Sequence, residues 1–155
     1  MSLAINVTFE GFNELVADAR DAGARGADKL LRAALTNSAG RVQSEQRQLA
    51  PHRTGTLQRS ILVQIKFPKA EITAQEKYAV FIEEGTGPFT IKPKTKKALF
   101  WPGAKHPVRM VRHPGIKAKP FFKPGYENAL PYVNAQFEQV TELLTVALSG
   151  KRGAY

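Results

Sequence analysis

The chain has 155 residues, of which 43% are hydrophobic, and carries a formal net charge of +10. This length fits one domain over residues 1–155, because a domain of this size buries roughly two-thirds of the surface of its unfolded chain. The absence of cysteine excludes disulfides, thiolate metal sites and a cysteine nucleophile. No stretch reaches the ~18 apolar residues of a membrane span, and the first residues do not have the pattern of a signal peptide. We therefore expect a soluble protein.

The first half of the chain alternates between strand and helix patterns. Residues 3–9 place Leu3, Ile5, Val7 and Phe9 on one face, which predicts a half-buried strand. Residues 12–19 carry apolar side chains at helical spacing and predict a helix that the following glycines interrupt. Residues 27–49 predict an amphipathic helix of about 20 residues and about 30 Å. Its second half is strongly polar, so its packing face narrows toward the end.

A turn-rich region follows this helix. Pro51 ends the helix, because proline disfavours helical geometry at the residue before it. Thr54 is expected to cap a single turn through its hydroxyl, and Ser60-Ile61 then opens an alternating strand. Residues 61–67 and 71–73, separated by a break at Pro68, predict an antiparallel meander. Residues 78–82 predict a third strand, which Gly85 halts.

The net charge is concentrated in one segment. Residues 85–126 contain ten basic residues and no acidic one, so this segment accounts for the whole formal charge. It repels itself and is rich in proline and glycine, which predicts an extended arm over residues 85–119 that reaches toward a negative partner. Residues 98–101 and 108–111 are candidates for the strands of an extended hairpin. The side chains expected to contact a partner or a neighbouring subunit are Lys92, Lys94, Lys96, Lys97, Phe100, Trp101, Lys105, Arg109, Arg112, Lys117 and Lys119.

The last element is the most regular. From Tyr126 to Ala147 seven apolar residues step by four and three positions, so they line one stripe of a helix. The stripe fits a coiled-coil seam with a neighbouring subunit, but packing on the domain's own sheet or first helix is the commoner arrangement. Pro131 is expected to kink this helix near its start. The elements together predict an α+β fold: a small antiparallel sheet with a long helix in the N-terminal half, a C-terminal helix, and an extended basic loop or hairpin arm.

No group of residues indicates an enzyme. His106 and His113 flank a cationic stretch without carboxylates, and a cationic neighbourhood opposes a divalent metal. Glu83 and Glu84 are adjacent on the expected third strand, so they point to opposite faces and do not converge on one substrate. An ion pair between one of them and the basic arm is the better explanation. We therefore expect no catalytic, cofactor-binding or metal-binding residues.

The basic segment is compatible with two functions, and also with a third interpretation in which it has no function of its own. Its cations can contact the phosphates of DNA, with Phe100 and Trp101 stacking on bases, in a largely sequence-independent way. The same arm can instead reach an acidic surface on another copy or another ring, with the aromatic side chains as apolar anchors. In the third interpretation the arm is a solvated loop and its aromatic side chains belong to the core. Charge alone sets only the sign of the partner.

Three short blocks in a fixed order give the chain a resemblance to a known family. They run from Ala50 to Ile61, from Tyr78 to Thr86 and from Lys119 to Pro124. At this spacing they resemble the small neck and tail-completion proteins of long-tailed double-stranded DNA phages and prophages, over residues 30–148. The residues that match the family's helix-to-strand corner are Pro51, Thr54, Gly55, Leu57 and Ser60. Those that match its central strand and the following turn are Tyr78, Phe81, Glu83, Gly85 and Thr86. Those that match the start of its final helix are Pro120, Phe121 and Pro124.

This resemblance implies a structural α+β subunit without a cofactor. Such a subunit is assembled in the host cytoplasm, forms a ring at the head-proximal end of the tail, finishes the tail and helps to join it to the head. The implied partners are further copies in a ring, expected to be a hexamer, and neighbouring neck, terminator or tail-tube proteins, with DNA passing through the ring lumen as an open alternative. A tail terminator that caps the tube is an alternative function, as is sequence-independent DNA binding by residues 85–126. Two features depart from the family: the long basic insertion, and Arg53 at a position that is often acidic.

Overall fold

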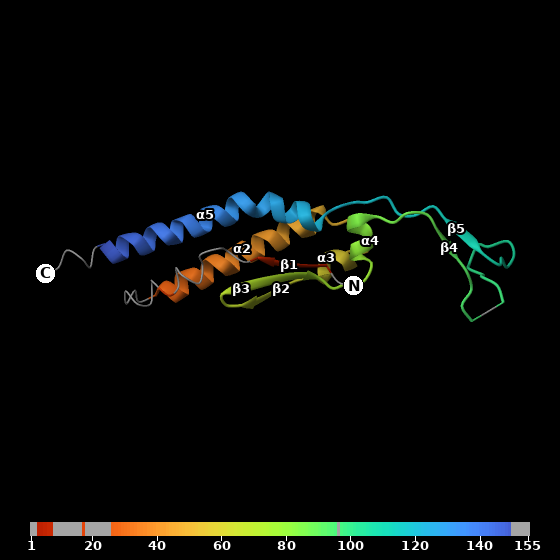
Figure 1. Cartoon of the computed structure of the whole chain (residues 1–155), viewed down its shortest axis with the longest axis horizontal. Helices are drawn as coiled ribbons and strands as arrows, with labels where there is room; N and C mark the ends of the chain where they lie inside the picture. Colours follow the sequence, from red (N-terminus) through yellow and green to blue (C-terminus); the bar gives the residue numbers. More distant parts are fainter. Residues whose placement is uncertain (1–2, 8–16, 18–25, 96, 150–155) are drawn as a thin grey trace.

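The structure is a computed structural model that describes residues 3–7, 17, 26–95 and 97–149. It has the predicted α+β architecture and an elongated shape, with the helices and the main sheet at one end and a narrow two-stranded extension at the other (Figure 1). The expected helix over residues 12–19 lies outside the described residues except for Ala17, as does the end of the first predicted strand.

Three antiparallel strands form the main sheet. They are β1 (Leu3–Val7), β2 (Ile61–Lys66) and β3 (Lys69–Ala74), in the order β1-β3-β2. Ile72 of the central strand lies opposite Ile5 on one side and Val63 on the other. Alternate residues of β3, namely Ala70, Ile72 and Ala74, are fully buried, because successive side chains of a strand point to opposite faces. The predicted first strand and the meander are thereby confirmed.

Two long helices cover the buried face of this sheet. Helix α2 (Ala27–Leu49) and helix α5 (Phe122–Ser149) lie side by side and run in opposite directions (Figure 1). They share the most extensive contact in the fold. Leu31 of α2 packs with Val140 and Leu144 near one end, while Val133 joins the core next to the sheet. The apolar stripe of the last helix therefore packs on the chain's own first long helix, as the commoner of the two predicted arrangements.

The polar second half of α2 makes specific contacts instead of a plain solvated face. Gln46 is fully buried, and its Nε2 donates a hydrogen bond to the carbonyl oxygen of Phe122 at 2.9 Å. Gln43 Nε2 and Arg47 Nη2 both donate to the carbonyl oxygen of Ile61, at 2.7 and 2.9 Å. Because buried backbone carbonyls need a partner, these side chains fix the positions of β2 and of the start of α5.

Two predictions near the turn-rich region are wrong. Residues 79–84 form a helix, α4 (Ala79–Glu84), and not a third strand. A short apolar run has no distinctive period, and here the buried Ala79 and the partly buried Ile82 lie three residues apart, at helical spacing. Thr54 does not cap the short helix α3 (Thr56–Ser60): the N-cap is Gly55, with a φ of 72°, and the Thr54 hydroxyl lies 2.9 Å from the hydroxyl of Thr56. The predicted end of α2 before Pro51 and the start of β2 at Ile61 are confirmed.

The basic segment leaves the body as a long two-stranded extension. Its strands are β4 (Phe89–Ile91) and β5 (Val111–His113), paired antiparallel with Phe89 opposite His113. The hairpin strands predicted over residues 98–101 and 108–111 are wrong in position, because that region holds a single bridge between Leu99 and Val108. The paired strands lie closer to the body, and none of the described residues from 86 to 119 is buried. Among the described helices, none is both long and apolar enough to cross a membrane.

Candidate functional site

The extension has two feet where it meets the body: the outgoing one at Thr86 and the returning one from Ile116 to Lys119. These two feet are hydrogen-bonded to each other and to the body. Thr86 and Ile116 exchange backbone hydrogen bonds of 2.8 and 3.1 Å, and the Ile116 amide also lies 3.0 Å from the Thr86 hydroxyl. The Lys119 amide donates to the carbonyl oxygen of Ile82 in α4 at 2.8 Å. The segment we call the arm, residues 85–119, therefore starts from a fixed base.

Two glycines allow this base to close. Gly85 and Gly115 have φ values of 75° and 94°, in the left-handed region that glycine adopts without steric cost. A Cβ atom at Gly85 would lie 2.7 Å from the carbonyl oxygen of Ile116, and one at Gly115 would lie 2.2 Å from that of Thr86. Both obstacles are backbone atoms that cannot rotate away. The glycines thus set the direction in which the arm leaves the body.

Glu83, at the end of α4 just before the arm begins, is hydrogen-bonded to the start of α5. Its Oε2 accepts hydrogen bonds from the amides of Phe121 and Phe122 at 2.7 and 2.9 Å, and its Oε1 accepts one from the amide of Lys123 at 3.0 Å. The first amides of a helix have no partner within the helix, and the N-terminal end of the helix dipole favours a negative charge. The carboxylate therefore caps α5. The sequence suggested an ion pair between Glu83 or Glu84 and a cation of the arm, but no such pair forms among the described residues.

A pocket of about 650 Å³ opens beside the feet of the arm. Its walls come from the first two sequence blocks and from the returning foot, with Leu57, Tyr78 and Ile82 among its apolar residues. Arg53, Lys117 and Lys119 add three cations, and no carboxylate belongs to the described lining. Arg53, which departs from the family pattern, thus lies with two arm cations at the same opening.

The other block residues support this region. Pro51, Thr54 and Gly55 line the pocket, and the Ser60 hydroxyl donates to the carbonyl oxygen of Leu57 at 2.7 Å. Phe121 is fully buried and meets Phe122 edge-on, with ring centroids 6.0 Å apart, so both rings hold the start of α5 in the core as predicted. The matched block residues classed as exposed are Thr54, Tyr78, Phe81 and Pro120, and Pro124 is half-buried. The three blocks, far apart in the sequence, converge on the base of the arm.

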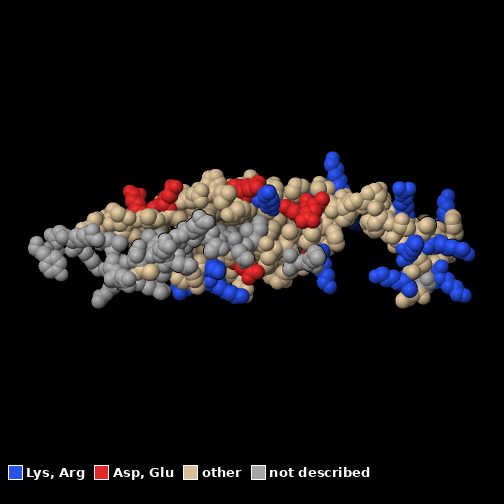
Figure 2. Space-filling view, viewed as in Figure 1, with Lys and Arg blue, Asp and Glu red and all other residues tan. Residues whose placement is uncertain are grey.

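The cations of the arm point into solvent. Figure 2 shows them gathered around the narrow end of the molecule, whereas carboxylates lie along the body, including the edge formed by α5. Lys96 lies outside the described residues, and the side chains classed as exposed are Lys92, Lys94, Lys97, Lys105, Arg109, Arg112, Lys117 and Lys119. Within the described part of the chain, none of these eight forms an ion pair. They are available to an external anion.

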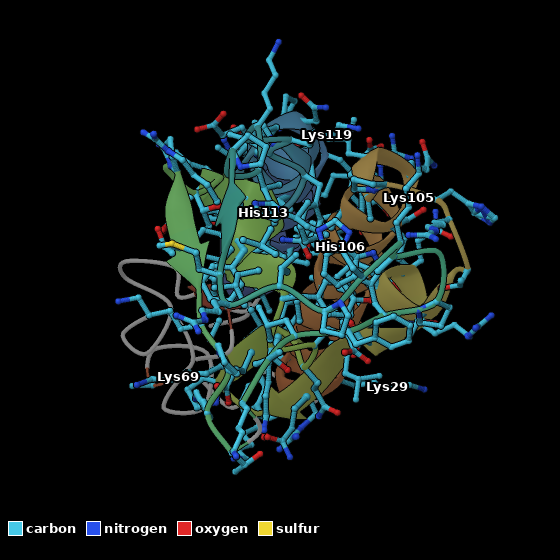
Figure 3. All side chains as sticks on the ribbon, turned by 90° about the vertical axis from the view of Figure 1, so that its right-hand side faces the viewer. Lys29, Lys69, Lys105, His106, His113 and Lys119 are labelled. Atoms are coloured by element: carbon cyan, nitrogen blue, oxygen red, sulfur yellow. The ribbon has the colours of Figure 1, made fainter. Side chains whose placement is uncertain are left out.

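Apolar side chains are exposed among these cations. Phe100, Trp101 and Met110 keep 67%, 47% and 55% of their surface accessible, so the aromatic pair does not belong to the core. Figure 3 looks straight at this end of the molecule, where Lys105, His106 and His113 lie on the arm. The His113 ring stacks on Phe89 at 4.8 Å, and its Nδ1 accepts a hydrogen bond from the Gly115 amide. Among the described residues, no three histidine, cysteine, aspartate or glutamate side chains lie close enough together to hold a metal ion.

Part of the chain is similar to a known protein family. Residues 13–85 match the family described as Bacteriophage HK97-gp10, putative tail-component. The resemblance to phage tail components is confirmed. The match covers the first two blocks and ends where the arm begins, so it includes α2, α3, β2, β3 and α4 but neither β1 nor α5. No curated protein and no solved structure matches the chain.

Over residues 13–85 the chain is similar to a family of structural phage tail components, which is not a family of enzymes. The sequence interpretation missed two parts of the site. The capping role of Glu83 could have been found from its conjunction with a proline-flanked helix start at residues 120–124. The exposed Ile91, Met110 and Ile116, which add apolar surface to the arm, carry no sequence signal that separates them from core residues.

Proposed function

We propose that the chain is a neck or tail-completion subunit that forms a ring at the head-tail junction, where it finishes the tail and helps to join it to the head. The observation that carries the proposal is the combination of a body that is similar to the HK97-gp10 family over residues 13–85 with an arm that is fixed at its base and buries none of its described residues. A domain gains nothing for its own stability from such an arm, since folding is driven by burial of apolar surface. The arm residues from Lys92 to Lys119 named above are the proposed contact surface.

A ring is the assembly that best fits this shape. An arm at one end of an elongated body contacts a different surface on its neighbour, and such a head-to-tail contact closes into a ring when the rotation between copies allows it. A hexamer would match the sixfold symmetry expected for the tails of such phages. The further partners are the neighbouring neck, terminator or tail-tube proteins.

Charge reversal in the arm tests the proposal. Replacing Lys94, Lys96 and Lys97 by glutamate is expected to reduce the yield of joined particles at least about tenfold while tails still assemble, because assembly contacts of this kind depend on complementary charge. The matched control reverses Lys29, Lys66 and Lys69, which are exposed on the body. If both triple variants join heads and tails as well as the unaltered chain does, the arm is not the joining surface.

The exposed cations and aromatic rings of the arm also support a second candidate, sequence-independent DNA binding. That function requires duplex affinity in the purified protein, falling steeply as salt is raised from about 50 to 200 mM because counterions are released. Absence of duplex binding at low salt would eliminate this candidate and leave the assembly role. A tail terminator differs from a neck subunit in its position, so location in the particle separates those two.

A further inference from the structure

We propose that the arm of each copy docks along the flank of helix α5 in the next copy. This inference rests on the proposed ring, and it names the surface that receives the arm. It follows from the distribution of charge, from an open groove on α5 and from the fixed direction of the arm.

The receiving surface is a groove on the C-terminal half of α5. The groove has a volume of about 580 Å³, and its lining includes Asn134, Glu138, Thr141, Glu142 and Val146. Glu138 and Glu142 are one helical turn apart and therefore lie on the same face. Both are exposed, and neither has a cation within ion-pair distance among the described residues. Two unneutralised carboxylates on one face favour the approach of a cation.

This groove is also apolar at its end. Val146 keeps 64% of its surface accessible, and Leu143, on the same stretch of helix, keeps 56%. Exposed aliphatic side chains beside carboxylates form a surface that suits a ligand with both apolar and cationic side chains. Such mixed surfaces occur where a protein contact has an apolar centre and a charged rim.

The arm has the complementary chemistry. Its outer part combines the cations Lys97, Lys105 and Arg109 with the exposed Phe100 and Trp101, and residues 85–119 contain no carboxylate. Aromatic and arginine side chains are the types that most often dominate protein contacts. The cations match Glu138 and Glu142, and the rings match the apolar end of the groove.

The geometry favours docking between copies over docking within one copy. The groove begins at Asn134, 12 residues after the start of α5 at Phe122, which is about 18 Å along the helix axis. The arm leaves the body at the opposite end and points away from this groove (Figure 1). The bonded base and the close contacts of Gly85 and Gly115 hold that direction. The donor and the acceptor surface therefore lie at opposite ends of each copy, as a head-to-tail contact requires.

An exchange of charges between copies tests the docking. One variant carries Glu138→Lys and Glu142→Lys, and the other carries Lys97→Glu, Lys105→Glu and Arg109→Glu. Each variant alone has like charges on both surfaces, so the number of copies retained on purified tails is expected to fall at least about tenfold. In an equimolar mixture the acidic arm of one variant meets the basic groove of the other, so retention is expected to recover. Recovery only in the mixture separates a direct contact from a general effect of charge.

The matched control reverses Glu71, on the sheet, and Glu127, at the start of α5 and outside the groove, and is expected to be retained normally. The docking is overturned if the groove variant alone is retained like the unaltered chain, or if the mixture is retained no better than either variant.

Crosslinking gives a second readout that does not depend on charge. The chain has no cysteine, so Met110→Cys in one copy and Thr145→Cys in another can be joined by a short bismaleimide only where arm and groove meet. A dimer band is expected from the mixture, and none from Met110→Cys mixed with Leu62→Cys on the sheet. If the chain occupies the head-tail junction but no Met110–Thr145 dimer forms in those particles, the docking is wrong and the proposed function stands. If the chain is absent from particles, the proposed function fails, and the same crosslink in concentrated purified protein decides the docking.

Discussion

Replacing Glu83 by alanine perturbs the point where the arm, α4 and α5 meet. The carboxylate accepts three backbone hydrogen bonds, from the amides of Phe121, Phe122 and Lys123. Glu84, the next residue, is exposed and makes no hydrogen bond or ion pair among the described residues. The two glutamates thus form a natural pair of test and control.

The structure allows the size of the effect to be worked out. Hydrogen bonds to a charged group contribute about 1.5–3 kcal/mol each, but the three share one partly exposed carboxylate, and loss of a helix N-cap costs about 0.5–2 kcal/mol. We therefore expect Glu83→Ala to lower the free energy of unfolding by about 2 kcal/mol. In a chain of this length that corresponds to a fall in Tm of about 4–8 °C. Glu84→Ala is expected to change the free energy of unfolding by less than about 0.5 kcal/mol.

Thermal unfolding followed by circular dichroism measures both variants. Amide exchange adds a local readout, because the amides of Phe121, Phe122 and Lys123 lose their acceptor only in Glu83→Ala. Equal Tm values for the two variants, with unchanged exchange at these three amides, would refute the capping role of Glu83.

Three further predictions concern glycines and the arm. Gly125→Ala should lower the free energy of unfolding, measured in urea, by about 1–3 kcal/mol, because its Cβ would lie 2.6–2.7 Å from atoms of Gln46 in α2. Gly40→Ala is the control: it has open space around it and should leave the free energy of unfolding unchanged or raise it by up to about 1 kcal/mol. A Gly40→Ala variant less stable than Gly125→Ala would contradict the close contact between the helices. Gly115→Ala should speed amide exchange at Ile116 while exchange in α2 and α5 is unchanged; unaltered exchange at Ile116 would show that the base tolerates the added atom. The amide of Ile91 should exchange quickly in the free protein and slowly in the assembled ring, and equal protection in both states would contradict docking of the arm.

Much of the fold could be predicted from the sequence because its long elements have clear periods. The apolar stripe from Tyr126 to Leu144 and the alternation at Leu3, Ile5 and Val7 each repeat often enough to fix the type of element. Their packing follows, since a stripe of this width must be covered by another element. The break at Pro51 was equally clear, because proline acts through local geometry alone.

The errors in the predicted elements fall where an element is short, or where contacts with residues far away in the sequence determine its conformation. Residues 79–84 contain too few apolar side chains to separate strand from helix, and the helix is held by contacts between Glu83 and residues about forty positions later. In the arm, the strands formed at Phe89–Ile91 and Val111–His113 and not at Ala98–Trp101, because the base bonds between Thr86 and Ile116 set the register from the body outward. Hydrogen bonds between distant segments leave no periodic signal.

The candidate site was predicted in its charge but not in its organisation. The acid-free segment after Gly85 pointed to an external negative partner, and the structure places eight of its described cations in solvent. That the three blocks converge on the base of the arm depends on the pairing of Thr86 with Ile116 and on the cap that Glu83 provides. Neither contact can be inferred without the fold, because each joins residues at least thirty positions apart.

The central claim is that copies of this chain form a ring at the head-proximal end of a phage tail and use the basic arm to hold neighbouring components. Electron cryomicroscopy of assembled tails from the phage that encodes the chain tests it most directly. The account predicts a closed ring at that end of the tail, with the density of each arm lying against the adjoining copy. A tail whose head-proximal ring contains no copy of this chain would contradict it.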